Sequence, residues 1–175
     1  MKYLHCLLTI SFLSGAILKA DDGWQKAKWG LKAAQVTELY PDAKKLAKPD
    51  TYEQKGVKYS SPLRLPSYDL VGKKFFVDFL FDAKGNLAGT TLGTPVAGGL
   101  QAVSLDIEYR NLKELLTRKY GQPSSIEHRA GGGETSVWLA GKTEIRINLT
   151  VSTATRESGI RLLYLQIRQE ELDKL

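Results

Sequence analysis

Apolar side chains recur along the chain with two periods, one typical of helices and one typical of strands. The clearest helical stripe lies in residues 105–120 and consists of Leu105, Tyr109, Leu112, Leu116 and Tyr120. Their spacing predicts an amphipathic helix, which Gly121 can cap and Pro123 ends. A shorter helix is predicted over residues 33–40, immediately before Pro41.

Apolar residues at every second position predict the strands. Every odd position in residues 75–81 is apolar, and a turn at 82–86, with Gly85 where a positive φ is needed, leads into residues 87–92. This pattern predicts a β-hairpin. Further strands are predicted over residues 136–140, 145–151 and 163–167. Two segments rich in Pro, Lys and Asp or in Gly, residues 41–56 and 94–104, are typical of connecting loops.

The order of these elements is helix, strands, helix, strands. It predicts an α+β fold of two helix-then-antiparallel-meander halves, with the helices packed on one face of the sheet. The halves would span residues 24–94 and 104–168, which is compatible with a diverged internal repeat. We therefore expect a single α+β domain over residues 21–175, because this length suits one domain.

The first 20 residues have the features of a secretory signal peptide. Lys2 supplies a positive start, residues 3–18 are mostly apolar, and small residues allow cleavage after Ala16 or after Ala20. The apolar stretch is shorter than the roughly 20 residues that span a bilayer. We therefore expect a signal peptide over residues 1–20, a periplasmic or secreted product, and no stable membrane span after cleavage.

Loss of the leader would also remove most of the reactive side chains. Met1, His5 and Cys6 would leave with it, so residues 21–175 contain no Cys, no Met and a single His, His128. This composition excludes a cysteine nucleophile, a thiolate or multi-His metal site and a structural disulfide from the mature chain. We expect no cofactor and no metal. The remaining 23 Lys and Arg against 19 Asp and Glu form no nucleic-acid motif, so nucleic acid is not an expected partner.

Three enzymatic patterns are present only in incomplete form. Gly141-Lys142-Thr143 and the glycines at 131–133 lack the spacing of a phosphate-binding loop, and both are predicted to be hairpin turns. His128 is predicted to be a structural residue of a short strand rather than a catalytic base. Asp78 and Asp82 share one strand face, but Asp82 opens the turn and both are predicted to be solvated. No catalytic residue is therefore assigned.

The sheet face opposite the predicted helices, here called the reverse face, is more informative. If the alternating apolar residues point at the helices, the reverse face carries Leu80 and six candidate binding residues: Phe76, Trp138, Arg146, Leu162, Tyr164 and Arg168. Trp, Tyr and Arg dominate binding hot spots, and a large exposed apolar patch usually marks a partner site. The alternatives are that residues 41–72 fold over this face or that two sheets pack together.

Two stretches resemble a known kind of protein. Trp29-Gly30-Leu31 with Val36 and Tyr40-Pro41 resembles the opening of small exported bacterial domains of unassigned function. The helix end Lys119-Tyr120-Gly121-Gln122-Pro123, followed by Trp138 and Thr143–Ile147, resembles the second half of the same domains. The layout is also similar to the tandem halves of β-lactamase-inhibitor-like proteins and to the small outer-membrane assembly lipoprotein. Both are non-catalytic binders, so the resemblance implies binding through a sheet face or loops.

These observations favour a non-catalytic role over an enzymatic one. The first hypothesis is an envelope or secreted protein that binds a protein partner of the cell envelope through the aromatic and arginine side chains of the reverse face. The second is a carboxylate-dependent hydrolase of a cell-envelope polymer, which needs two carboxylates at ~5–9 Å in a cleft. The third is a carrier with an apolar pocket between helices and sheet.

Overall fold

The computed structural model describes residues 22–95, 97–98, 100–129, 133–152 and 157–168. Its elements, in chain order, are β1 (Gly23–Trp24), β2 (Ala27–Lys28), α1 (Ala33–Leu39), β3 (Lys44–Gln54), β4 (Val57–Leu70), β5 (Lys73–Phe81), β6 (Leu87–Gly93), β7 (Ala97–Gly98), α2 (Leu100–Tyr120), β8 (Ser125–His128), β9 (Glu134–Ala140), β10 (Thr143–Ser152) and β11 (Glu157–Gln166). The predicted leader, residues 1–20, lies outside the described residues.

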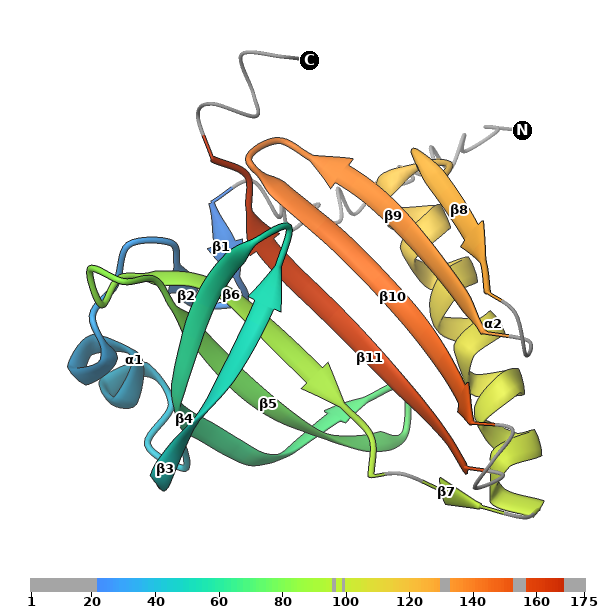
Figure 1. Cartoon of the computed structure of the whole chain (residues 1–175), viewed down its shortest axis with the longest axis horizontal. Helices are drawn as coiled ribbons and strands as arrows, with labels where there is room; N and C mark the ends of the chain where they lie inside the picture. Colours follow the sequence, from blue (N-terminus) through green and yellow to red (C-terminus); the bar gives the residue numbers. More distant parts are fainter. Residues whose placement is uncertain (1–21, 96, 99, 130–132, 153–156, 169–175) are drawn as a thin grey trace, which may run out of the picture.

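Most strands belong to one continuous antiparallel sheet (Figure 1). Within the described residues its order is β3-β4-β5-β6-β11-β10-β9-β8, and β7 pairs with the start of β11. The sheet is continuous across its middle because β6 pairs with β11, with Thr91 opposite Leu163 and Leu92 opposite Leu162. β1 and β2 form a separate two-stranded pair.

The predicted α+β architecture of two helix-then-meander halves is wrong, because the described part of the chain is mostly strand, with only two helices. The main cause is the segment 41–56, which was expected to be a loop and instead forms β3. β3 is an edge strand whose side chains are largely exposed, so Lys, Asp and even Pro49 are tolerated there. The segment 94–104 is also not a loop throughout, because α2 begins at Leu100.

Elements with a strong local signal formed as predicted. In α2 the stripe residues Leu105, Tyr109, Leu112 and Leu116 are buried in the core. β5 and β6 form the expected hairpin, in which Gly85 has a φ of 71°. Asp82 accepts hydrogen bonds from the backbone amides of Lys84 and Asn86 at 2.8 and 2.9 Å, as a turn-opening Asp does.

The sheet buries side chains on both of its faces. On the helix face, α1, α2 and the β1–β2 pair cover a large core that includes Val36, Phe79, Leu112, Trp138 and Ile145. On the reverse face a smaller cluster joins Tyr59 of β4 to Leu80 of β5 and to Leu163 and Leu165 of β11. Figure 1 shows the reason: α2 lies behind the strands, whereas the β3–β4 hairpin crosses in front of them.

A polar contact holds α2 against β9. The Glu134 carboxylate accepts hydrogen bonds from Tyr109 Oη at 2.8 Å, Ser136 Oγ at 3.1 Å and Lys113 Nζ at 2.5 Å. Burial raises the pKa of Glu134, but the hydrogen bonds from Lys113 and Tyr109 outweigh it, so the pKa lies below its usual value. The carboxylate is therefore charged at neutral pH and anchors the helix.

Candidate functional site

The β3–β4 hairpin folds over the reverse face and reaches β10. Irregular pairing between Lys45 and Asp50, and again along β4 and β5, marks bulges that let the hairpin bend. Lys55 and Gly56 form its tip with φ values of 50° and 74°. Lys55 Nζ lies 2.7 Å from the Glu144 carboxylate of β10. The β3–β4 hairpin, here called the roof, therefore covers the reverse face and is held to β10 at its tip by an ion pair.

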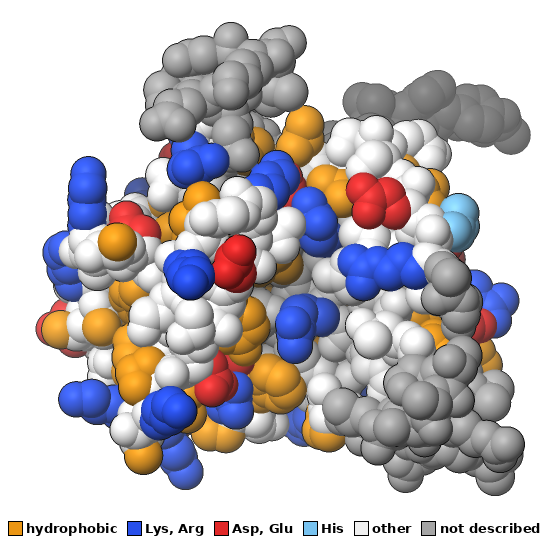
Figure 2. All heavy atoms as spheres, viewed as in Figure 1, with side chains coloured by type: hydrophobic (Ala, Val, Ile, Leu, Met, Phe, Trp, Pro, Cys, Tyr) orange, Lys and Arg blue, Asp and Glu red, His pale blue; other side chains and the backbone are white. Residues whose placement is uncertain are grey.

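A cleft of about 530 Å³ remains between this roof and the sheet. Its apolar and aromatic lining comprises Tyr52, Tyr59, Phe76, Leu80, Ile160, Leu163 and Leu165. Its charged and polar lining includes Glu53, Thr91, Arg129, Arg146, Asn148, Thr150, Ser158 and Arg161. In Figure 2, Lys and Arg side chains gather on this face beside the hairpin, over β9, β10 and β11. The volume falls in the range of sites that enclose a small ligand.

Three arginines face one carboxylate in this cleft. Among the described lining residues Glu53 is the only acid, against Arg129, Arg146 and Arg161. The Arg161 guanidinium lies 5.7 Å from the ring centroid of Tyr52. In the part of the chain that the structure describes, no carboxylate lies within ion-pair distance of Arg129 or Arg161. The cleft therefore carries positive charge that a ligand can neutralise.

Arg146 is held at the wall of the cleft by its neighbours. Its Nη2 donates to the Glu144 carboxylate at 2.9 Å. In the amide orientation that satisfies both groups, the Gln54 oxygen accepts from Nη2 and Nη1 at 3.2 and 3.1 Å. Arg146 Nε is buried without a hydrogen-bond partner. The guanidinium is thus positioned but not saturated.

Thr91 contributes an unpaired hydroxyl to the cleft floor. The residue is 1% exposed, lines the cleft, and its Oγ1 has no hydrogen-bond partner. Its strand neighbours on the same face are Asp78 of β5 and Leu163 of β11. Leu163 in turn pairs with Arg146, so Thr91 and Arg146 lie in one row across the sheet. Buried polar groups are normally satisfied, so an orphan hydroxyl such as that of Thr91 calls for an explanation.

Asp78 lies beneath the roof, and both of its carboxylate oxygens already accept hydrogen bonds. It is 0% exposed, which contradicts the prediction that it is solvated. Arg64 donates to its two oxygens from Nε at 2.6 Å and from Nη2 at 2.9 Å, and Tyr52 Oη donates at 2.5 Å. Burial and then the hydrogen bond to Asp78 raise the pKa of the Tyr52 hydroxyl, so it remains a donor. Asp78 therefore fastens the hairpin and is not presented to a substrate.

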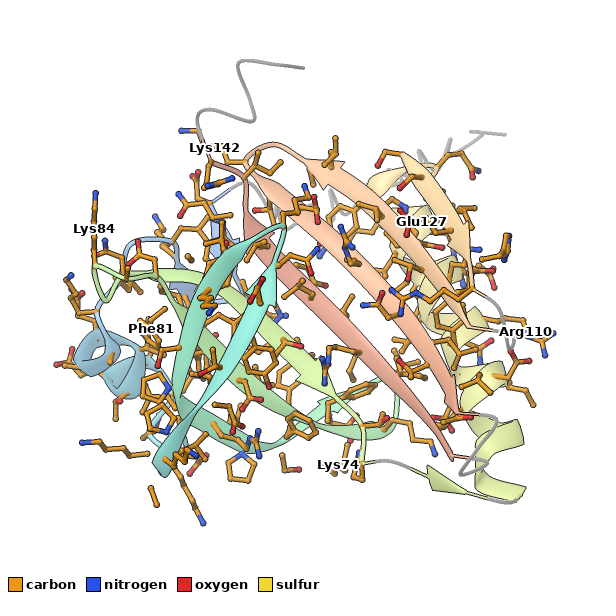
Figure 3. All side chains as sticks on the ribbon, viewed as in Figure 1. Lys74, Phe81, Lys84, Arg110, Glu127 and Lys142 are labelled. Carbon is orange, nitrogen blue, oxygen red and sulfur yellow. The ribbon has the colours of Figure 1, made fainter. Side chains whose placement is uncertain are left out.

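A smaller cavity of about 280 Å³ adjoins the cleft on the other side of Arg146. It lies between the hairpin tip and the β8–β9 edge, and its lining includes Lys55, Ser125, Glu127, Leu139 and Glu144. Glu127, which Figure 3 labels, belongs to β8 at the edge of the sheet. This cavity brings both signs of charge together, whereas the main cleft is dominated by arginine.

The predicted binding residues separate into three groups. Phe76, Leu80 and Arg146 line the cleft, and Leu80 also belongs to the small apolar cluster of the reverse face. Arg168 is exposed and lines neither cavity within the described residues. The other three, Trp138, Leu162 and Tyr164, lie on the helix face.

The placement of these three on the reverse face is wrong because β9 and β11 have the opposite phase. Ile145 of the helix-face core pairs with both Trp138 and Tyr164, so the side chains of Trp138 and Tyr164 also point to the helices. Leu162 belongs to the same core. Residues 162–165 are all apolar, and either alternate set satisfies a buried face. The register brings Arg161 to the cleft instead, together with Tyr52, Tyr59, Thr91 and Arg129 from elements whose packing the sequence pattern did not reveal.

The residues that the sequence suggested for phosphate binding or acid–base catalysis lie, where the structure describes them, in a turn or at a strand end. Gly141 and Lys142 join β9 to β10 as a turn, as predicted, which is not the strand-to-helix junction of a phosphate-binding loop. The glycines 131 and 132 lie outside the described residues. His128 ends the edge strand β8, with Nδ1 3.6 Å from Glu134 and its side chain 76% exposed. Within the described residues, no cluster of His, Cys, Asp and Glu could hold a metal, and no helix is long and apolar enough to cross a membrane.

Comparison of the chain with models of known families, with curated proteins and with solved structures gives no match. The likeness to exported domains and to inhibitor-like proteins therefore stays a prediction.

Proposed function

We propose that this protein is an exported, non-catalytic binding protein that takes its ligand into the cleft between the β3–β4 hairpin and the reverse face of the sheet. The observation that carries the proposal is the cleft itself, a concavity of about 530 Å³ in which arginine and aromatic side chains converge. Concave sites with an apolar lining and a few placed polar groups are where proteins bind small ligands. Export is supported by the leader pattern of residues 1–20.

The lining supports binding rather than hydrolysis. A carboxylate-dependent hydrolase needs two acids at ~5–9 Å across the substrate. Among the described residues of this cleft Glu53 is the only carboxylate, and nearby Asp78 is already held by Arg64 and Tyr52. The arrangement offers donors and ring faces, which hold a ligand, but no acid–base pair.

The β3–β4 hairpin restricts how a protein partner could reach the reverse face. The reverse face is not an open platform, because the hairpin covers Leu80, Leu163 and Leu165. An envelope protein would reach Arg146 and Phe76 only by inserting a side chain or a chain end into the cleft. The carrier hypothesis changes in the same way, since both cavities are lined by reverse-face residues rather than by the interface between helices and sheet.

The test maps binding with a variant that fills the cleft. Gly159 lines the cleft, and a Cβ built there meets no atom within 4 Å, so Gly159→Phe should direct its ring into the open space of the cleft. Thr51→Phe adds the same ring to an exposed position of β3 outside the cleft lining and is the matched control. The measurement is NMR chemical-shift mapping with a library of neutral, anionic and cationic fragments.

We expect the fragments that bind to shift cleft residues such as Thr91 and Arg161, and to lose binding in Gly159→Phe but not in Thr51→Phe. Fragments that bind Gly159→Phe as well as the parent, or that shift residues on the helix face, would contradict the proposal.

A further inference from the structure

We infer that the ligand of the cleft is an organic anion, with one phosphate or carboxylate group on an apolar body. This inference rests on the proposed function and names its ligand class. It depends on three features of the reverse face: the surplus of arginine, the orphan hydroxyl of Thr91 and the ordering of polar and apolar positions across the strands.

Strand register places the polar groups of the floor in adjacent rows. One row across β6, β11 and β10 contains Gly93, Arg161 and Asn148, and the next contains Thr91, Leu163 and Arg146. Arg161 and Arg146 are therefore diagonal neighbours on adjacent strands, a spacing that long side chains bridge. Asn148 lies opposite Arg161 and follows Arg146 on the same face of β10. Its amide oxygen accepts a hydrogen bond from Thr135 Oγ1 at 2.8 Å.

The geometry suits an anionic head group. Guanidinium groups bind carboxylate and phosphate through paired hydrogen bonds, and such charge-assisted bonds are stronger than neutral ones. Arg161 has no carboxylate partner among the described residues, and Arg146 keeps its Nε–H free. The buried Thr91 hydroxyl has no partner in the protein, so it can donate to an anionic oxygen that reaches the cleft floor.

The neighbouring surfaces suit an apolar body. The next row along the sheet contains Gly89 and Leu165, beside Leu80, and Tyr59 of the hairpin packs over them. At the other end the ring of Phe76 lies against Gly93, where a Cβ would come within 2.3 Å of it. A cationic ligand would meet three arginines and one glutamate, and a wholly apolar ligand would supply no anion to Arg129 and Arg161, which have no carboxylate partner among the described residues.

Two threonine substitutions give a matched pair for the test. Thr90 and Thr91 are adjacent in β6, are equally buried, and both have an orphan Oγ1. Thr90 pairs with Phe79 and Tyr164 and so belongs to the helix face, whereas Thr91 belongs to the cleft. Valine removes the hydroxyl with little change in shape. Both variants should fold at least as stably as the parent in urea unfolding, because each removes an unsatisfied buried polar group.

The binding measurement is isothermal titration calorimetry of the purified protein with octanoate, octyl phosphate and octan-1-ol, and with inorganic phosphate alone. We expect octanoate or octyl phosphate to bind about tenfold or more tightly than octan-1-ol. The anion that binds with the higher affinity, octanoate or octyl phosphate, identifies the preferred head group. Thr91→Val and Arg161→Gln should each weaken anion binding about fivefold or more, and Thr90→Val should leave it unchanged.

Each alternative outcome has a defined meaning. Equal affinity for octan-1-ol and the anions, with binding lost in Gly159→Phe, would overturn the anion inference and leave the proposed cleft in place. Anion binding that persists in Gly159→Phe and in Arg161→Gln would overturn both. Binding of inorganic phosphate as tight as that of octyl phosphate, or an absence of heat with all four probes, would also overturn the inference of an organic anion.

Discussion

The Tyr52 hydroxyl donates a 2.5 Å hydrogen bond to the carboxylate of Asp78, and so joins the edge hairpin to the buried middle of β5. This contact makes the roof of the cleft part of the folded core rather than a loose flap. Arg64 supplies the balancing charge from β4 and also stacks on Phe76, with its Cζ 4.6 Å from the ring centroid. The stability of the hairpin and the shape of the cleft therefore depend on the same few residues.

Removing Arg64 is expected to expose the cost of a buried charge. Arg64→Met leaves the fully buried Asp78 with only the Tyr52 hydroxyl, and should lower the free energy of unfolding by about 2–4 kcal/mol. The double variant Arg64→Met/Asp78→Leu removes both charges and should recover most of that loss. Urea unfolding of the three proteins measures the difference. A double variant no more stable than Arg64→Met would contradict this account.

Trp138 is expected to be a stability residue. It is 1% exposed, packs in the helix-face core, and donates from Nε1 to the Gly121 carbonyl at 2.9 Å. Trp138→Ala should lower the free energy of unfolding by about 3–5 kcal/mol. The control is Leu139→Ala on the opposite face of β9, where the side chain is 42% exposed and the loss should be below about 1 kcal/mol. Similar thermal midpoints for the two variants would place Trp138 outside the core.

The anchor between α2 and β9 predicts a pH dependence of stability. The pKa of Glu134 is lower in the folded protein than its ordinary value of 4.5, so its contribution is fully present above pH 4.5 and is lost as the pH falls through the folded value. Glu134→Gln should therefore destabilise the protein at pH 7, and the difference from the parent should shrink below pH 4.5. Chemical unfolding at several pH values measures it.

The exposed Glu127 of β8, which forms no ion pair within the described residues, gives the matched control for this experiment. Glu127→Gln should change stability little at any pH. A gap between parent and Glu134→Gln that stays constant from pH 7 to pH 3 would show that the Glu134 charge does not stabilise the fold.

The leader predicts a processed N-terminus. In a bacterial host that exports it, the protein should begin at Ile17 or Asp21, because small residues precede both positions. Ala20→Glu should abolish the second start and leave the first, and Ala16→Glu should do the reverse. Intact mass and N-terminal sequencing of the envelope and medium fractions distinguish them. Recovery of the whole chain, still carrying Met1, in the cytoplasmic fraction would refute export.

The sequence pattern predicts correctly those elements whose signal is local. The stripe of Leu105, Tyr109, Leu112 and Leu116 specified α2, and the alternation of residues 75–81 with the turn at Asp82 specified the β5–β6 hairpin. Phe76 and Arg146 were also assigned to the correct face, because the unbroken apolar odd positions of β5 and the alternation of β10 fix the phase of both strands. β3 was missed, since an exposed edge strand needs no apolar alternation and its Lys-rich pattern is the same as that of a loop.

What the chain determined by itself was therefore its periodicities, its shortage of reactive side chains and the leader pattern. The tertiary structure decided which side of β11 faces the helices, because the apolar run 162–165 satisfies either phase until pairing with β6 and β10 selects one. It also decided that the β3–β4 hairpin covers the reverse face, through Tyr52, Asp78 and the contact of Lys55 with Glu144. Contacts between residues so distant in sequence leave no local pattern, and the arginine-lined cleft exists only because of them.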